Sequence, residues 1–431
     1  MLKIQLPTIV LLFGYFVILL VLGVPISMSL GISSIFTIWI NEPINISYVA
    51  QLSFASIDKT AIMCIPFFVA SGDLMGIGGL SRRLFSMADE FLGSAYGGLA
   101  LATVATCVLF GAMSGSGPAT VAAIGALCVP AMVDRGYDQK FSAAIVASAG
   151  AIGVLIPPSN PFVVYAISAN VSVGKLFMAG LGAGVVYGLV SIVYIYFYAH
   201  KNKIPRDKKV GGKELLHYLI DAAWALMIPV IILGGIYGGF CTATEAAGIS
   251  AIYAAFVGVV IYRELDWKGI LNACSATARS CGEILVLVAA AQALGWMLTR
   301  GQVPQIVTSF IAANIHSKIL FLLLVNVVLL VMGMFMEGVA SIIIVAPLIY
   351  PAAVALGVDP IHLGTIMISN LAIGMFTPPF GMNIFVTSSI TKADMVEMLP
   401  GIIRFCIVDL IALLLMTYIP QISMFLPNLL K

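Results

Sequence analysis

The stretch from Gly111 to Phe162 decides the fold of this chain, because the chain contains its skeleton twice. It begins with a glycine- and serine-rich knot, GAMSGSGPAT at 111–120, and later has a double proline, GVLIPPSN at 153–160. An offset of 221 positions brings the same residues back in the second half, as four pairs show: Gly117 and Gly338, Asp138 and Asp359, Pro157 and Pro378, and Pro158 and Pro379. Glycine and proline set the shape of the backbone. Because the repeat is preserved at these glycines and prolines, we infer that the breaks they make in the helices carry the function of the protein.

The composition excludes a water-soluble globular protein. Of 431 residues, 61% are hydrophobic and only 9% are charged, and the mean hydropathy is +1.10. Soluble domains contain roughly 25% charged residues. The apolar runs do not alternate as barrel strands do. Because a membrane-spanning helix needs about 20 mostly apolar residues, the predicted fold is an all-α polytopic membrane protein with roughly ten to twelve transmembrane helices plus two re-entrant hairpins.

The densest basic cluster divides the chain into two halves. It comprises Lys201, Lys203, Arg206, Lys208, Lys209 and Lys213. Loops rich in Lys and Arg face the cytoplasm. We therefore predict a first repeat over 1–200, a cytoplasmic basic loop and connecting segment over 201–223, and a second repeat over 224–431. Each repeat would contain scaffold helices, one hairpin and one broken helix. The apolar N-terminus is interpreted as the first transmembrane helix, because no small-residue cleavage motif follows it.

Cysteine and histidine residues give no sign of a metal centre. The seven cysteines are scattered through apolar surroundings, and the four histidines are equally dispersed. None of them has the spacing of a metal site. We therefore expect no metal site of this kind and no organic cofactor.

Two elements in each half are predicted to be interrupted. Pro118 has no amide hydrogen and follows glycines that relax the backbone, so Ser114–Pro118 favours the tip of a re-entrant hairpin. Pro157–Pro161 ends the helix that precedes it. Unwound backbone at membrane depth is tolerated only where protein buries it or where it lines a water-filled cavity. Paired interruptions of this kind point to a solute and ion site in membrane transporters.

Each hairpin tip and its neighbouring break can form a cage of oxygen atoms. The first cage would use the hydroxyls of Ser114 and Ser116 and the carbonyls of Gly153, Ile156 and Pro158. Repeat symmetry then gives a second cage of Glu337, Gly374, Thr377 and the carbonyl of Phe380. Such ligands suit a weakly hydrated alkali cation. The alternative is that the glycines and prolines only permit tight helix packing, as small residues commonly do in membranes. Because the hairpin-tip motif and the double-proline motif both recur at the same offset, we favour the oxygen cages over this packing alternative.

Four polar residues are candidates for contact with a solute: Ser159, Asn160 and Asn383, between the two cages, and Asp73. Asp73 lies close to membrane depth, where an isolated charge is costly and suggests a function. Its alternative roles are to cap a helix start or to pair with Arg82 or Arg83. Two further segments, 80–92 and 266–283, are amphipathic or polar and are predicted to lie in the membrane interface.

Over nearly its whole length the sequence resembles the large membrane subunit of the tripartite ATP-independent periplasmic (TRAP) transporters. The resemblance rests on Ile65-Pro66-Phe67-Phe68 with Gly78-Gly79, on Ser114-Gly115-Ser116, on Leu155-Ile156-Pro157-Pro158-Ser159, on Thr244-Glu245-Ala246-Ala247, and on Thr377-Pro378-Pro379. It implies a sodium-driven uptake system of the bacterial inner membrane, with inverted repeats and an elevator-type transport domain that contains the two hairpins. The two oxygen cages would then be sodium sites.

The resemblance also implies the partners and the solute. The partners would be a small four-helix membrane subunit, as a separate polypeptide, and a periplasmic substrate-binding protein, with membrane lipid around the chain and no nucleic acid. The solute would be a carboxylate such as a dicarboxylate, a sialic acid, a keto acid or a sugar acid. Gly117-Pro118 after the serine knot is similar to the sialic acid branch of the family.

Three other functions compete with this interpretation. A stand-alone sodium and carboxylate symporter with the same paired hairpins would need no accessory subunit. An intramembrane enzyme using Ser114 or Ser116 is disfavoured, because no His or Lys lies near enough in the sequence at membrane depth to act as a base. A channel is disfavoured because two re-entrant loops with double prolines favour an occludable site. No Walker-type ATPase motif occurs, so the energy is expected to come from an ion gradient.

Overall fold

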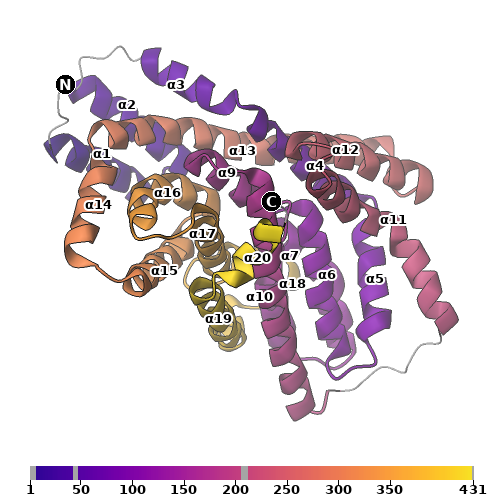
Figure 1. Cartoon of the computed structure of the whole chain (residues 1–431). Coiled ribbons are helices and arrows are strands. Elements are labelled where there is room, and N and C mark those ends of the chain that lie inside the picture. Colours follow the sequence, from indigo (N-terminus) through magenta and orange to yellow (C-terminus); the bar gives the residue numbers. More distant parts are fainter. Residues whose placement is uncertain (1–5, 42–46, 205–211, 430–431) are drawn as a thin grey trace.

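The computed structural model describes residues 6–41, 47–204 and 212–429, and over these residues the chain is helical without any strand (Figure 1). Nine of the helices in this part are long and apolar enough to cross a membrane, and counting the bent pair α8–α9 as one span gives ten. The predicted all-α polytopic fold is confirmed, with a number of spans at the lower end of the expectation. Part of the basic segment, residues 205–211, lies outside the described residues.

The helices before the basic segment are α1 (Leu6–Val21), α2 (Ile26–Asn41), α3 (Ser47–Ile57), η1 (Thr60–Met63), α4 (Cys64–Ile77), α5 (Leu80–Leu92), α6 (Gly98–Ser114), α7 (Gly117–Asp134), α8 (Gln139–Leu155), α9 (Asn160–Ala169) and α10 (Val173–Lys201). Those after it are α11 (Gly212–Tyr237), α12 (Ala243–Phe256), η2 (Val257–Ile261), α13 (Trp267–Arg300), α14 (Val303–Asn314), α15 (Lys318–Phe335), α16 (Gly338–Ala355), α17 (Pro360–Gly374), α18 (Met382–Thr391), α19 (Met395–Tyr418) and α20 (Gln421–Leu429).

The helix boundaries reproduce the offset of 221 positions found in the sequence. The offset carries both ends of α7, Gly117 and Asp134, onto both ends of α16, Gly338 and Ala355. It also carries the first residue of α8 onto the first residue of α17. Each half therefore contains a helical hairpin, α6–α7 or α15–α16, followed by a broken helix, α8–α9 or α17–α18.

The two broken helices run in opposite directions. At one end, Gln139 at the start of α8 donates a hydrogen bond to the carbonyl of Thr391 at the end of α18, at 2.9 Å. At the other end, the hydroxyl of Tyr165 in α9 donates to the carbonyl of Pro360 at the start of α17, at 2.8 Å. The start of each broken helix thus lies beside the end of the other, which is the arrangement of an inverted repeat.

Glycines allow each hairpin to cross its broken helix at very short range. A β-carbon built on Gly153 of α8 would lie 3.0 Å from the α-carbon of Gly111 in α6. In the second half, a β-carbon built on Gly333 of α15 would lie 3.0 Å from the α-carbon of Gly374 in α17. Backbones that approach this closely are typical of helix packing in membranes, where small residues form the contact. The packing role that the sequence left as an alternative is therefore real at these positions.

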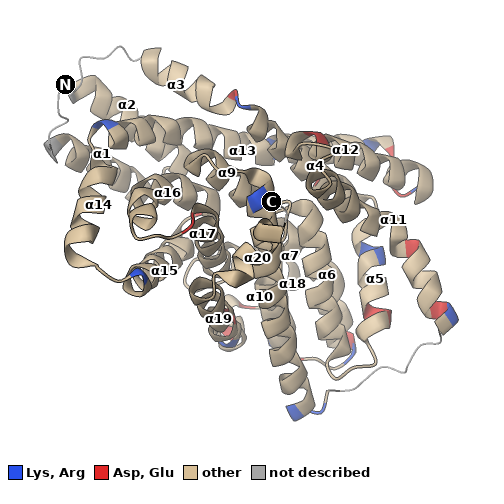
Figure 2. Ribbon diagram, in the orientation of Figure 1, with Lys and Arg blue, Asp and Glu red and all other residues tan. Residues whose placement is uncertain are grey.

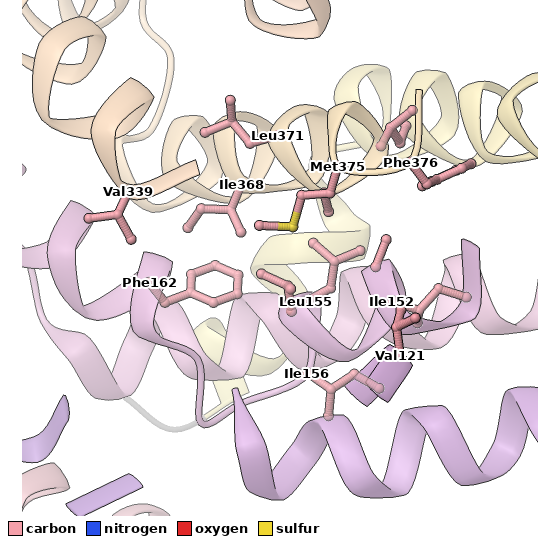
Figure 3. Close-up of a cluster of buried hydrophobic side chains, with 14 of the residues drawn as sticks. Val121, Ile152, Leu155, Ile156, Phe162, Val339, Ile368, Leu371, Met375 and Phe376 are labelled. Atoms are coloured by element: carbon pink, nitrogen blue, oxygen red, sulfur yellow. The ribbon is translucent and has the colours of Figure 1, made fainter. Parts of the chain in front are cut away.

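The hairpins and broken helices of both halves share one apolar core. Figure 3 shows side chains from α7, α8, α9, α16 and α17 directed toward one another, among them Val121, Leu155, Phe162, Val339 and Ile368. All five are buried. We call α6–α10 and α15–α20 the core group, because these helices pack together around this cluster.

The remaining helices form a second assembly beside the core group. We call α1–α4 and α11–α13 the outer group; α13 packs against α2, α3 and α4, and α4 packs against α12. Two short helices connect the groups along the chain, α5 between α4 and α6 and α14 between α13 and α15. The predicted amphipathic helix at 80–92 is confirmed as α5.

The outside of the molecule matches a membrane environment. One stripe of α15, formed by Leu320, Leu324, Val327 and Val331, is exposed along the whole helix. Figure 2 shows that most of the ribbon has no charged residue and that the Lys, Arg, Asp and Glu segments gather mainly near helix ends. A soluble monomer rarely exposes such long apolar surfaces.

The segment 266–283, predicted to lie in the membrane interface, forms the first half of α13, a single helix of 34 residues. At 1.5 Å per residue this helix is about 51 Å long. Its polar side chains Ser280 and Glu283 line a cavity, and the location of this segment in the interface stays a prediction.

Candidate functional site

A cavity of about 500 Å³ lies where the hairpin tips, the helix breaks and the outer group meet. We call it the central cavity. Its lining residues come from the first tip (Gly115, Ser116, Gly117, Pro118, Ala119), the first break (Val154, Asn160, Pro161), the second tip (Glu337, Val339, Ala340), the second break (Met375, Met382), α2 (Ile26, Ser27) and α13 (Ser280, Glu283, Ile284, Leu287). The sequence predicted that tips and breaks come together, and the structure brings them to one place.

Four helices begin at the central cavity. The first residues of α7, α9, α16 and α18 line it or directly follow residues that line it. The N-terminus of a helix has unpaired amide hydrogens and the positive end of the helix dipole. Side chains cap α7 and α16, whereas α9 and α18 have no side-chain cap, so the N-termini of α9 and α18 are the ones suited to an anion.

The first hairpin tip is held by hydroxyl groups. Ser116 is the N-cap of α7, and its hydroxyl accepts a hydrogen bond from the amide of Ala119 at 3.4 Å. The hydroxyl of Ser114, which is buried, lies 3.1 Å from the hydroxyl of Thr120. Thr120 also donates to the carbonyl of Ser116 at 2.8 Å. Sequence reasoning named the two serines and missed Thr120.

The first break contacts this tip through its backbone. Gly115 has a left-handed backbone with φ of +60°, and a β-carbon there would lie 2.6 Å from the carbonyl oxygen of Pro158. A β-carbon on Gly153 would lie 3.2 Å from the hydroxyl oxygen of Thr120. The structure thus groups Ser114, Ser116 and Gly153 around Thr120, with Pro158 beside Gly115 at the same tip. The side chain of Ile156 packs against Gly184 of α10.

The second hairpin tip is capped by a carboxylate. Glu337 is the N-cap of α16 and accepts hydrogen bonds from the amides of Val339 at 3.0 Å and Ala340 at 3.2 Å. Ser341 donates from its hydroxyl to the carbonyl of Glu337 at 3.2 Å. The repeat offset carries Thr120 onto Ser341, so both tips have the same hydroxyl-to-carbonyl contact. A hydroxyl-bearing residue at the same position of both repeats was the sequence signal that could have identified Thr120 and Ser341.

The second break is arranged differently from the first. The hydroxyl of Thr377 donates to the carbonyl of Ile373 at 2.7 Å and lies 3.6 Å from the sulfur of Cys406 in α19. The amide of Thr377 donates to the carbonyl of Gly374 at 3.1 Å. Phe380 is 57% exposed. No hydrogen bond in the described part of the chain joins Thr377 to Glu337, so the second cage stays a prediction.

Three predicted solute contacts have polar atoms that are buried without a partner. The hydroxyl of Ser159 and the amide oxygens of Asn160 and Asn383 accept no hydrogen bond among the described residues. Asn160 lines the central cavity, and a β-carbon on Gly117 at the first tip would lie 3.4 Å from the amide oxygen of Asn383. Buried polar groups normally have a partner. Unpartnered groups at a cavity are therefore candidates for binding a ligand.

Asp73 lies apart from these three residues. It is inside α4, and its carboxylate accepts a hydrogen bond at 2.7 Å from the hydroxyl of Thr277 in α13. It does not cap a helix start. Arg82 and Arg83 pair with other carboxylates, both with Glu264 and Arg83 also with Asp221. The structure therefore joins Asp73 to the contact between α4 and α13, and its role toward a solute stays a prediction.

Two carboxylates at membrane depth were not proposed from the sequence as functional. Glu283 of α13 lines the central cavity together with Glu337. Asp409 of α19 is buried inside the core group, where it accepts hydrogen bonds from Ser148 at 2.9 Å and Ser191 at 3.2 Å. An ionisable residue within an apolar run is itself a functional signal. That signal was present at 405–416 and would have identified Asp409.

The fold and the cavity define a class of protein. Doubled, oppositely directed hairpins and broken helices around a shared cavity are the architecture of secondary membrane transporters. Residues 13–422 match the family described as the tripartite ATP-independent periplasmic transporter, DctM component. The chain belongs to this family, as the resemblance in the sequence predicted.

Relatives of known class match nearly the whole chain. It is 48% identical over 417 residues to the isethionate TRAP transporter permease protein DctMQ of Oleidesulfovibrio alaskensis, covering 96% of this chain and 65% of the relative. It is 43% identical to the C4-dicarboxylate TRAP transporter large permease protein DctM of Pseudomonas aeruginosa, covering 93% and 94% of the two chains. It is 33% identical to the sialic acid TRAP transporter large permease protein SiaM of Vibrio cholerae, covering 95% and 96%.

A solved structure has the same kind of fold. The YdaH transporter of Alcanivorax borkumensis matches with a TM-score of 0.65 and 15% identity, over 88% of this chain and 89% of that one. At this identity the likeness concerns the fold alone. The family and the helices together make the chain a multi-pass protein of the inner membrane and a transport permease, which is not an enzyme.

Proposed function

We propose that this chain is the membrane transport subunit of a sodium-driven, binding-protein-dependent uptake system for a small organic anion. One observation supports it above all: the central cavity, where four helix N-termini from both repeats converge on unpartnered polar groups. Solute and coupling-ion sites of secondary transporters lie at such interrupted helices near the midplane of the membrane. The core group would move relative to the outer group as an elevator.

Sodium would bind at the two hairpin tips. Unwound carbonyls and helix ends coordinate sodium in transporters of this kind. The first site would use the oxygen cluster around Thr120, with Ser114, Ser116, Gly153, Ile156 and Pro158. The second would use Glu337, whose carboxylate provides a negative charge, with Gly374, Thr377 and Phe380.

The solute would be a small organic acid. Helix N-termini favour an anion. The hydroxyl of Ser159 and the side-chain NH2 of Asn160 would donate hydrogen bonds to it. The NH2 of Asn383 already donates to the carbonyl of Ala147 at 3.0 Å, so the amide oxygen of Asn383 would accept from a hydroxyl of the solute. Asp73 would act from the α4–α13 contact. The two more similar relatives are named for isethionate and C4-dicarboxylates, and the less similar one for sialic acid. We therefore place a two- to four-carbon sulfonate or dicarboxylate ahead of a sialic acid.

The partners would be a small four-helix membrane subunit and a periplasmic substrate-binding protein. The chain spans 65% of the isethionate relative, whose name combines the letters M and Q, and 94% of the C4-dicarboxylate large permease. The alternative is a stand-alone sodium and organic-acid symporter.

Uptake into proteoliposomes tests this function. The chain would be reconstituted with and without its small subunit, and radiolabelled isethionate, succinate or N-acetylneuraminate would be added with and without the matching binding protein. An inward sodium gradient would be compared with an equal potassium gradient.

We expect uptake of one of these acids only when sodium, the small subunit and the binding protein are all present. Uptake by the chain alone would support the stand-alone symporter. Equal uptake with sodium and potassium would contradict sodium coupling.

A further inference from the structure

A second cavity lies along the seam between the core and outer groups. It has a volume of about 240 Å³ and is lined by α9, α13 and α16 and by the end of α3 with its connection to η1. Its polar side chains are Ser56, Lys59, Ser168, Gln292 and Thr299. Lys59 is its one charged lining residue among the described residues, so we call it the Lys59 cavity.

The Lys59 cavity continues the central cavity along the same three helices. On α9 the central cavity ends at Pro161 and the Lys59 cavity begins at Val164. On α13 the corresponding residues are Leu287 and Val288, and on α16 they are Ala340 and Ile343. One helical turn or less therefore separates the two cavities, and the residues between them are Phe162 and Val163 on α9 and Ser341 and Ile342 on α16, of which only Ser341 is polar.

The Lys59 cavity lies toward the side of the membrane opposite the basic segment. Ser168, near the end of α9, is followed after a short turn by α10. α10 has 29 residues and ends at Lys201, where the basic segment begins. At 1.5 Å per residue it is about 43 Å long, which is more than the hydrocarbon core of a bilayer. Because basic segments face the cytoplasm, the Lys59 cavity faces the periplasm.

The chemistry of the Lys59 cavity favours an anion. No carboxylate of the described residues forms an ion pair with Lys59, and Asp58 beside it does not line the cavity. The hydroxyls of Ser56, Ser168 and Thr299 donate to carbonyls of their own helices. The donors left for a ligand are the ammonium of Lys59 and the side-chain amide of Gln292. Lys59 and Gln292 are both exposed, so both are open to a solute that enters the cavity.

We propose that the Lys59 cavity is an access subsite that holds a small organic sulfonate or carboxylate on the periplasmic side before it reaches the central cavity. The proposal rests on the proposed function for the class of solute. The volume of the cavity is below the roughly 300–1,000 Å³ of sites for drug-sized ligands, so it suits an acid of a few carbons. Movement past the residues between the cavities would accompany displacement of the core group along α13.

The charge of the cavity is tested without any solute. Ser168→Cys would be treated in membranes with an anionic and a cationic methanethiosulfonate reagent, and peptide mass spectrometry would distinguish position 168 from the native cysteines. We expect the anionic reagent to react about fivefold faster than the cationic one, because a positive cleft concentrates anions. Lys59→Gln should bring this ratio close to one. The matched control is Lys175→Gln, on the same side at the start of α10 but outside the cavity, which should leave the ratio unchanged.

The role in uptake is tested with isethionate and succinate. Lys59→Gln should raise the KM for uptake about fivefold with little change in the maximal rate, whereas Lys59→Arg should stay near the wild type, since the charge is retained. Equal KM values for Lys59→Gln and wild type would overturn the subsite, as would a reagent ratio that does not depend on Lys59. Failure of the wild type to take up any acid would contradict the proposed function instead, and the reagent ratio would still decide the charge of the cavity.

Discussion

Thr120 and Ser341 occupy the same position in the two repeats, and each ties a hairpin tip to its own helix. Each donates to the carbonyl of the residue that caps its helix, which is Ser116 or Glu337. In the first tip the hydroxyl oxygen of Thr120 also lies beside that of Ser114 and close to Gly153. A threonine that already donates its hydrogen has lone pairs to offer to a cation. This makes Thr120 the residue on which the proposed first sodium site would depend most directly.

Thr120→Val is therefore expected to weaken sodium activation of uptake. The side chain keeps nearly the same shape and loses only the hydroxyl, and a lost hydrogen-bonding group of this kind is worth about 1–1.5 kcal/mol. The sodium concentration for half-maximal uptake should rise about tenfold, since about 1.4 kcal/mol corresponds to a factor of ten. The measurement is initial uptake rate against sodium concentration in proteoliposomes.

Thr120→Ser is the matched control, because it restores the hydroxyl and removes only a methyl group. Its sodium dependence should stay close to that of the wild type. If the valine and serine variants have the same sodium dependence, then the hydroxyl of Thr120 does not contact the ion.

The secondary elements were largely predictable, because glycine and proline act locally on the backbone. Ser114–Pro118 predicts a hairpin tip and Pro157–Pro161 a broken helix wherever the fold places them. The first half of α13 was not predictable in the same way. Ser280 and Glu283 are polar because they line the central cavity, but a polar side chain toward a cavity and one toward the interface have the same sequence pattern.

The close crossing of α15 and α17 leads to a prediction about Gly333. Gly333→Ala would place a β-carbon 3.0 Å from the α-carbon of Gly374, and neither backbone can move without shifting a helix. Overpacking of this kind costs about 1–3 kcal/mol. We expect a lower midpoint of thermal unfolding in detergent, measured by tryptophan fluorescence.

Gly282→Ala is the matched control for this substitution. Gly282 lies inside α13, and no atom is within 4 Å of the position of its β-carbon. Alanine favours the helix by up to about 1 kcal/mol over glycine. Its unfolding midpoint should equal or exceed that of the wild type. Equal midpoints for the two alanine variants would mean that the crossing tolerates a side chain.

At the scale of the whole molecule, the sequence predicted two repeats but not how their side chains meet. Nothing in the spacing of Asn160 and Asn383 shows that both leave an amide oxygen unpartnered near one cavity. The direction of Thr377 toward Cys406 in α19 was equally beyond the sequence, because it depends on a helix that packs from a distant part of the chain. Packing between distant parts of the chain determines these side-chain contacts, whereas the sequence repeat determines where the helices begin and break.

The seam between the two groups is where an elevator would slide, and a covalent bridge across it should stop transport. Leu287 of α13 and Ala340 of α16 line the central cavity from opposite groups. The double variant Leu287→Cys/Ala340→Cys would be cross-linked with a short bifunctional thiol reagent. We expect the cross-linked protein to lose at least about 90% of its sodium-driven uptake, because the core group can no longer move past α13. Each single cysteine variant with the same reagent should keep its uptake.

A bridge inside one group separates blocked sliding from simple damage by the reagent. A β-carbon on Gly31 of α2 would lie 3.5 Å from that of Ala290 in α13, which is within the range for a disulfide. Both residues belong to the outer group, so Gly31→Cys with Ala290→Cys should be joined by the reagent and still transport. If the bridge between α13 and α16 forms completely and uptake continues, the two groups do not slide along this seam. Transport would then require only local opening of the hairpin tips around the central cavity.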